Sequence, residues 1–232
     1  MILYFAGMNG NIAELYSAVK NGCQHLMLSY YHDKSRVSES QWRRFRNLGL
    51  HIMLDSGAFS AWKINAIINI DEYIKYIKIH NIGKYISLDE VGNPEKSYYN
   101  LKYIEKHKLY PIPVFHFGSD FKYLDQLVQE KYKLIALGGT VGKKIKERRE
   151  FFNECFHKYK NTYFHGLGMT DINLLKEFEW ASIDSSTWLI GRKHNKLIIE
   201  SGKRITAPEH MTLEDKSGHN VKFFSNLVKN LQ

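Results

Sequence analysis

The sequence predicts an α/β fold in which eight parallel strands alternate with helices and close into a single barrel. Eight short apolar runs recur at nearly even spacing along the 232 residues. Each run is continuous rather than alternating, as expected for strands covered on both faces. Segments of helical character separate the runs, and this alternation is typical of a parallel sheet. The chain length suits one (β/α)₈ barrel, the TIM-barrel architecture.

The predicted strands occupy residues 1–7, 25–31, 51–56, 85–91, 110–117, 133–139, 162–168 and 181–186. Between them, apolar residues recur at the i, i+3, i+4 and i+7 positions of one helix face over 70–77 and again over 152–159. Pro94 suits the first turn of a helix, and Asp171 can cap the helix that follows it. The whole chain, 1–232, is therefore expected to form one domain.

The segment 189–218 interrupts this alternation and is predicted to be a basic insertion between the eighth strand and the last helix, 219–231. A loop of this length at a barrel mouth is often functional. The alternative is an extra hairpin, with a strand at 197–199. Its basic side chains are candidates for binding nucleic acid: Arg192, Lys193, Lys196, Lys203 and Arg204.

The amino-acid composition limits the classes of protein to which this chain can belong. A hydrophobic content of 44% supports a substantial core, and no apolar run reaches the roughly 18 residues of a membrane span. The N-terminus is interpreted as a strand rather than a signal peptide. Two cysteines suggest neither a disulfide framework nor a zinc cluster, so we expect no metal site and a cytoplasmic location. The net charge of +9 favours a polyanionic partner such as nucleic acid over the alternative explanation, solvated lysines on the outer helices.

Three predicted strands end in an aspartate: Asp55, Asp89 and Asp184. Parallel barrels present their catalytic groups at the carboxyl ends of the strands, so these acids are expected to face one mouth. A single aspartate of this kind is more simply explained as a turn residue that bonds its own backbone. Three of them on separate strands favour an enzyme.

Other strand ends supply candidate binding groups. His116 ends the fifth predicted strand, and the glycines of the sixth and seventh leave bare backbone that suits a flat ligand or a phosphate. Phe59, Trp62 and Trp188 follow two of the acids and could stack on bases or simply pack beneath the loops. Met169 could pack on a base, although methionine more often fills a core. The candidates at the later strands are Gly138, Gly139, His165, Gly166 and Met169.

Four segments resemble, in order, motifs of the tRNA-guanine transglycosylase superfamily: Asp55-Ser56-Gly57-Ala58-Phe59, Leu137-Gly138-Gly139-Thr140-Val141-Gly142, His165-Gly166-Leu167-Gly168 and Ile183-Asp184-Ser185. The variants are similar to the phage and bacterial branch that inserts 7-deazaguanines into DNA. The resemblance implies a pentosyltransferase without cofactors that exchanges guanine in DNA for a base such as 7-cyano-7-deazaguanine. It also implies the host cytoplasm, if the protein is phage-encoded, and a homodimer as in many relatives.

By the same resemblance, Asp184 would form a covalent glycosyl intermediate and Asp55 would move protons on the departing and incoming bases. Asp89 would read the base edge, and His116, Gly138 and Gly139 would contact the base, with Ser56, Gly57 and Phe59 beside it. The chain lacks the zinc-binding cysteines of the tRNA-modifying members, which favours DNA over tRNA.

Three alternatives remain from the sequence. A tRNA substrate is one. A TIM-barrel glycosidase or hydrolase acting on a small nucleoside-like molecule through Asp55 and Asp184 is another. The last is a nucleic-acid-binding barrel without catalysis, which would leave the acidic strand ends unexplained.

Overall fold

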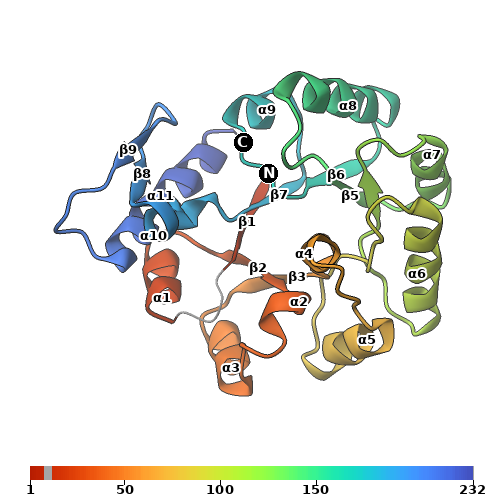
Figure 1. Ribbon diagram of the computed structural model, residues 1–232, viewed down its shortest axis with the longest axis horizontal. Coiled ribbons are helices and arrows are strands. Elements are labelled where there is room, and N and C mark those ends of the chain that lie inside the picture. Colours follow the sequence, from red (N-terminus) through yellow and green to blue (C-terminus); the bar gives the residue numbers. More distant parts are fainter. Residues whose placement is uncertain (8–11, 232) are drawn as a thin grey trace.

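The computed structural model describes residues 1–7 and 12–231 and shows a curled parallel sheet surrounded by helices (Figure 1). The sheet order is β3-β2-β1-β7-β6-β5-β4, and every neighbouring pair is parallel. Its strands are β1 (Ile2–Ala6), β2 (His25–Ser29), β3 (His51–Asp55), β4 (Val114–His116), β5 (Leu134–Gly138), β6 (Tyr163–Gly166) and β7 (Ser182–Ser185). The expected parallel α/β fold of the TIM-barrel type is confirmed at this level.

The strand expected at 85–91 is not formed as a continuous strand. Only isolated parallel bridges occur there, from Leu54 to Tyr85 and from Ile86 to Ile112. The N–H of Ile86 donates to Leu54 O at 2.8 Å, and the N–H of Ser87 donates to Ile112 O at 2.8 Å. These bonds connect the β3 edge to the chain just before β4. Prolines at 111 and 113 flank Ile112 and lack an N–H, so a longer ladder cannot form and β4 begins only at Val114.

Most of the helices surround the outside of the sheet, whereas α4 (Ala58–Lys63) lies near the centre of the ring (Figure 1). The helices are α1 (Ile12–Lys20), α2 (Tyr30–Asp33), α3 (Glu39–Asn47), α4 (Ala58–Lys63), α5 (Ile70–Ile79), α6 (Pro94–Lys106), α7 (Lys122–Gln129), α8 (Ile145–Lys158), α9 (Ile172–Glu177), α10 (Ile190–His194) and α11 (Leu213–Lys229). The predicted starts at Pro94 and Asp171 are confirmed: Pro94 opens α6, and the Asp171 carboxylate accepts from the N–H of Asn173 at 3.0 Å.

The segment 189–218 is more ordered than a loop. A short 3₁₀ helix, η1 (Thr187–Leu189), leads into α10, and an antiparallel hairpin follows, formed by β8 (Lys196–Ile198) and β9 (Arg204–Thr206). The last helix begins at Leu213, earlier than expected, because the side chain of Thr212 accepts from the N–H of Asp215 and caps it. Figure 1 shows the hairpin at the edge of the molecule beside α10 and α11, whereas α4 lies near the centre of the ring.

The core has two parts. A larger cluster lies between the sheet and its helices, and a smaller one fills the inside of the sheet with Tyr4, Met27, Met53, Ile86, Ile112, Val114 and Ala136. Side chains alternate between the two because successive residues of a strand point to opposite faces. Among the described residues, no helix has the length and apolar character that crossing a membrane requires.

Candidate active site

A cavity of about 180 Å³ opens at the carboxyl ends of the strands. Its walls are formed by strand ends and by the loops that follow them, as in other parallel barrels. The lining residues are Met27, Asp55, Ala58, Phe59, Ser60, Asp89, Val91, His116, Gly138, Gly139, Val141, Leu167, Gly168 and Asp184. All three predicted acids and one of the two predicted histidines, His116, therefore meet in one place.

Asp55 is the last residue of β3 and is only partly accessible to solvent. Its Oδ2 accepts a hydrogen bond from the N–H of Gly57 at 3.0 Å. Burial raises the pKa of Asp55 to about 7, and the negative charges of Asp89 and Asp184 add to the effect. The N–H groups of Gly57 and Ser56 oppose the rise but do not cancel it. Asp55 can therefore hold or release a proton near neutral pH.

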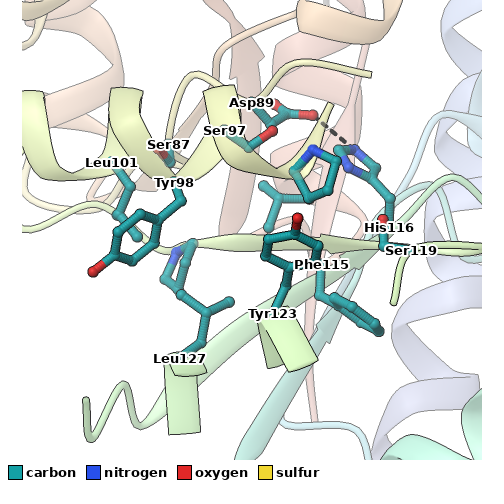
Figure 2. Close-up of a pocket in the computed structure, with 13 residues that line it drawn as sticks. Ser87, Asp89, Ser97, Tyr98, Leu101, Phe115, His116, Ser119, Tyr123 and Leu127 are labelled. Atoms are coloured by element: carbon teal, nitrogen blue, oxygen red, sulfur yellow. Dashed lines mark ion pairs between the residues drawn. The ribbon is translucent and has the colours of Figure 1, made fainter. Parts of the chain in front are cut away.

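Asp89 and His116 form an ion pair, with His116 Nε2 2.9 Å from Asp89 Oδ2 (Figure 2). The other carboxylate oxygen, Oδ1, accepts from the hydroxyl of Ser56 at 3.3 Å. Both side chains are almost completely buried. The hydroxyl of Ser56 also accepts from the N–H of Ala58 at 3.2 Å, so this serine joins α4 to the acidic group. Ser56 thus acts on the cavity through Asp89.

A second, much smaller cavity lies behind this pair, between β4, α6 and α7 (Figure 2). Its volume is about 20 Å³, which is room for one water molecule. Ser87 lines it and is buried, and the Ser87 hydroxyl has no protein partner. Asp89 and His116 line both cavities and therefore form the wall between them.

Asp184 lies on β7 and is buried except for its opening to the cavity. Its Oδ1 accepts a hydrogen bond from the N–H of Gly168 at 2.9 Å. The same oxygen lies 3.4 Å from Nε2 of His165, a ring with no exposed surface. The backbone of Gly168 and the imidazole of His165 thus both contact the Asp184 carboxylate.

The structure brings some of the predicted site residues to the cavity and leaves others out. Asp55, Asp89, His116 and Asp184 line it together with Phe59, Gly138 and Gly139. His165, Gly166 and Met169 do not, and their predicted contact with a substrate is not supported by this geometry. Met169 belongs to the outer core, and a Cβ on Gly166 would lie 3.0 Å from the ring of Trp180.

Gly57 shapes the cavity without lining it. Its φ of +79° lies in the left-handed region, and a Cβ there would approach Cβ of Tyr31 to 2.4 Å. Only glycine fits this turn, which carries the chain from Asp55 into α4.

Two of the three aromatic candidates for base stacking are exposed, and the third is buried. Phe59 and Trp62 on α4 are 37% and 52% exposed, with their rings stacked at 6.0 Å. Trp188 is completely buried, and its Nε1 donates to the carbonyl of Ala6 at 2.8 Å. Trp188 is therefore part of the core rather than a stacking surface.

The five basic residues predicted to bind nucleic acid do not surround the cavity. Arg192 pairs with the buried carboxylate of Glu14 on α1, and Lys196 Nζ donates to the hydroxyl of Thr206 at 2.8 Å. The remaining three are exposed around the hairpin at the edge of the molecule: Lys193, Lys203 and Arg204. None of the five lines the cavity, and their contact with nucleic acid stays a prediction.

Sequence reasoning missed several lining residues, mainly small or apolar side chains: Met27, Ala58, Ser60, Val91, Val141, Leu167 and Gly168. Most of them lie a few residues after a strand end, and that position is the signal that could have identified them. Among residues 1–7 and 12–231, no group of three or more His, Cys, Asp or Glu side chains is arranged to hold a metal ion.

No family model and no curated protein matches the sequence. Solved structures of similar fold include a 4-hydroxy-2-oxoglutarate aldolase, 9% identical, with a TM-score of 0.60 over 98% of this chain and 94% of the other. The tryptophan synthase alpha chain of Legionella pneumophila is 14% identical, with a TM-score of 0.63 over 99% and 92%. N-(5'-phosphoribosyl)anthranilate isomerase of Pyrococcus furiosus is 12% identical, with a TM-score of 0.54 over 99% of both chains.

At these identities the likeness shows the fold alone. The similar structures are aldolase, synthase and isomerase barrels, and these findings contradict the resemblance to the tRNA-guanine transglycosylase superfamily. The predicted DNA base exchange, which followed from the resemblance, is therefore wrong. Its glycosidase and tRNA alternatives are contradicted by the same findings. Four short motifs in register gave too little information, because acidic and glycine-rich strand ends occur in many barrels with different activities.

Proposed function

We propose that the protein is an enzyme of the aldolase or lyase type, which cleaves or forms a carbon–carbon bond beside a carbonyl group by acid–base catalysis. One observation carries the proposal: two of the three carboxyl groups in a single cavity lie in different surroundings. Burial raises the pKa of Asp55 to about 7, while Asp184 accepts a hydrogen bond from the N–H of Gly168 and lies 3.4 Å from His165 Nε2. Carboxyl groups in such contrasting surroundings commonly divide the acid and base roles between them.

In the cleavage direction, Asp184 accepts the proton of the β-hydroxyl group, whose O–H electrons form the new carbonyl. The carbon–carbon bond breaks, and its electron pair passes to the α-carbon and the carbonyl of the other fragment. Protonated Asp55 donates to that carbonyl oxygen, which gives an enol. The proton on Asp184 then returns to the α-carbon while the enol hydroxyl returns its proton to Asp55, so the enzyme is regenerated.

His116 and Asp89 line the same cavity, and we assign them to holding polar groups of the substrate. Their ion pair fixes both side chains, which reduces the entropy lost when a substrate is bound. The net charge of +9 favours an anionic substrate. The proposed substrates are therefore anionic β-hydroxy carbonyl compounds, and one barrel of similar fold is an aldolase of a hydroxy-oxo acid.

Exchange of the α-hydrogen provides a direct test. Purified protein is incubated with a panel of hydroxy-oxo and oxo acids in deuterated buffer, and proton NMR follows both cleavage and loss of the α-hydrogen signal. We expect Asp55→Asn and Asp184→Asn each to lower the rate by about 100-fold or more. Asp120→Asn is the matched control, because this carboxylate is exposed and contacts Lys122 only.

The proposal fails if both site variants keep the rate of the unmodified protein. It also fails if no compound of the panel is cleaved or exchanged while the protein remains folded by circular dichroism. A rate that falls in the Asp120 variant as well would assign the effect to general charge rather than to the cavity.

A further inference from the structure

We infer that His165 is a positioning residue that presents the N–H of Nε2 to the carboxylate of Asp184 and so keeps this carboxylate in its proton-accepting form. The inference rests on the proposed function only for the role of Asp184. Its structural basis is independent: a completely buried imidazole beneath the cavity, with one nitrogen bonded and the other directed at the carboxylate.

The placement follows from strand geometry. Ser182 and Asp184 are two residues apart on β7 and therefore point to the same face, the inside of the sheet. His165 on β6 pairs with Ser182 in the parallel ladder. The inside is otherwise filled mainly by apolar side chains, such as Met53 and Ala136. A buried polar ring there needs partners, and Ser182 and Asp184 are the ones within reach.

The neighbours of the two ring nitrogens indicate which nitrogen of His165 carries the proton. Nδ1 of His165 lies 2.8 Å from the Ser182 hydroxyl oxygen, whereas Nε2 makes no hydrogen bond with the described residues and lies 3.4 Å from Asp184 Oδ1. If Nδ1 carried the only proton, the lone pair of Nε2 would face a carboxylate oxygen, which is repulsive. If Ser182 donates to Nδ1, Nε2 carries a proton and the contact with Asp184 is attractive.

Few other charges reach this ring. The edge of Tyr4 on β1 contacts it, with ring centroids 6.2 Å apart. The Tyr4 hydroxyl accepts from Lys84 Nζ at 3.3 Å, so that cation contacts the tyrosine. From β5, the paired residue is Ala136, which carries no charge. Among the described residues, Asp184 is therefore the charged group that His165 contacts directly, at 3.4 Å.

The first test reads the proton directly. In protein labelled with ¹⁵N at histidine, the chemical shifts of His165 distinguish a protonated from an unprotonated ring nitrogen. We expect a protonated Nε2 near neutral pH. A proton on Nδ1 alone would overturn the inference. The measurement needs no substrate, so its outcome is separate from that of the activity assay.

A pair of isosteric substitutions supplies the second test. In His165→Gln the amide nitrogen can take the place of Nε2, whereas in His165→Asn it can take the place of Nδ1. The titration of Asp184 is followed by NMR of ¹³C-labelled carboxyl carbons. In His165→Asn we expect the midpoint to rise by about one to two pH units, because the N–H that faces the charged form is lost.

In His165→Gln we expect most of this rise to be absent. Both substituted side chains are polar, so a difference between the variants cannot arise from the mere loss of a buried ring. Equal titration of Asp184 in both variants and the unmodified protein would overturn the inference, and so would an equal rise in both. If Asp184→Asn keeps activity while the NMR results hold, the proposed function fails and the contact stands.

Discussion

The ring of His116 packs against Gly138 on the neighbouring strand while its Nε2 lies 2.9 Å from the carboxylate of Asp89. A Cβ added to Gly138 would lie 3.1 Å from Cδ2 of His116 and 3.3 Å from a methyl group of Val114. The missing side chain at 138 therefore sets where the imidazole can lie.

Gly138→Ala should move His116 away from its place beside Asp89. We expect about 1–3 kcal/mol of destabilisation from overpacking and about a tenfold loss of catalytic rate from misplacement. Chemical denaturation and the exchange assay measure the two effects. Gly83→Ala is the matched control, because a Cβ there meets nothing within 4 Å and no left-handed φ is involved. Equal behaviour of the two variants would refute the packing argument.

The stability of the protein should depend on pH through Asp55. Burial raises the pKa of its carboxyl from 3.8 to about 7, so the folded state binds this proton more tightly than the unfolded chain. The stabilising contribution is complete below about pH 4 and is lost as the pH rises to about 7.

Asp55→Asn cannot ionise and should remove this dependence. Relative to the unmodified protein, the variant should gain up to about 4 kcal/mol of unfolding free energy between about pH 4 and pH 8. Urea denaturation across this range measures the gain, with Asp120→Asn as the control that should show little of it. A constant difference between Asp55→Asn and the unmodified protein at every pH would contradict the prediction.

Position 57 should require glycine for two reasons: its left-handed φ and the lack of space for a Cβ. Gly57 and Gly92 share a φ of +79°, but a Cβ at 57 would collide with Tyr31 whereas one at 92 meets nothing within 4 Å. We expect Gly92→Ala to cost about 1–2 kcal/mol for the left-handed backbone alone. Gly57→Ala should cost about 1–3 kcal/mol more because of the clash. Thermal or urea unfolding compares the two, and equal losses would exclude a steric role for Tyr31.

Arg192 should contribute to stability rather than to ligand binding. Its guanidinium pairs with Glu14, whose side chain is completely buried and also accepts from the hydroxyl of Ser217 at 2.9 Å. Removing one partner of a buried pair is strongly destabilising, so Arg192→Ala should lower the free energy of unfolding by about 3–5 kcal/mol. Arg204→Ala, on the exposed strand β9, should change it by less than about 0.5 kcal/mol. Similar small effects would show that the Glu14 pair contributes little.

Much of the fold could be predicted because its signals are local. Continuous apolar runs identified the strands, and the helix starts at Pro94 and Asp171 follow from side-chain chemistry within one turn. The prediction failed at 85–91, where pairing depends on a distant segment containing Pro111 and Pro113. A strand forms only where its backbone can pair with a neighbouring strand, and a run of apolar residues does not show whether such a neighbour exists.

The residues of the candidate site could be predicted in part from the sequence. Asp55, Asp89, His116 and Asp184 were identifiable because each lies at or near the end of an apolar run, and parallel topology brings such ends together. His165 looked equally exposed to a substrate from its position in the chain. Only its packing beneath Asp184, with no exposed surface, assigns it to a supporting place.

The amino-acid sequence alone determined the class of fold and the strand ends that carry acids, because hydrophobic periodicity and strand polarity are properties of the chain. Tertiary structure decided which groups touch, how burial and the charges of Asp89 and Asp184 raise the pKa of Asp55, and which basic residues are paired. These properties depend on distances and on the exclusion of water, which arise only when segments far apart in the chain are packed together.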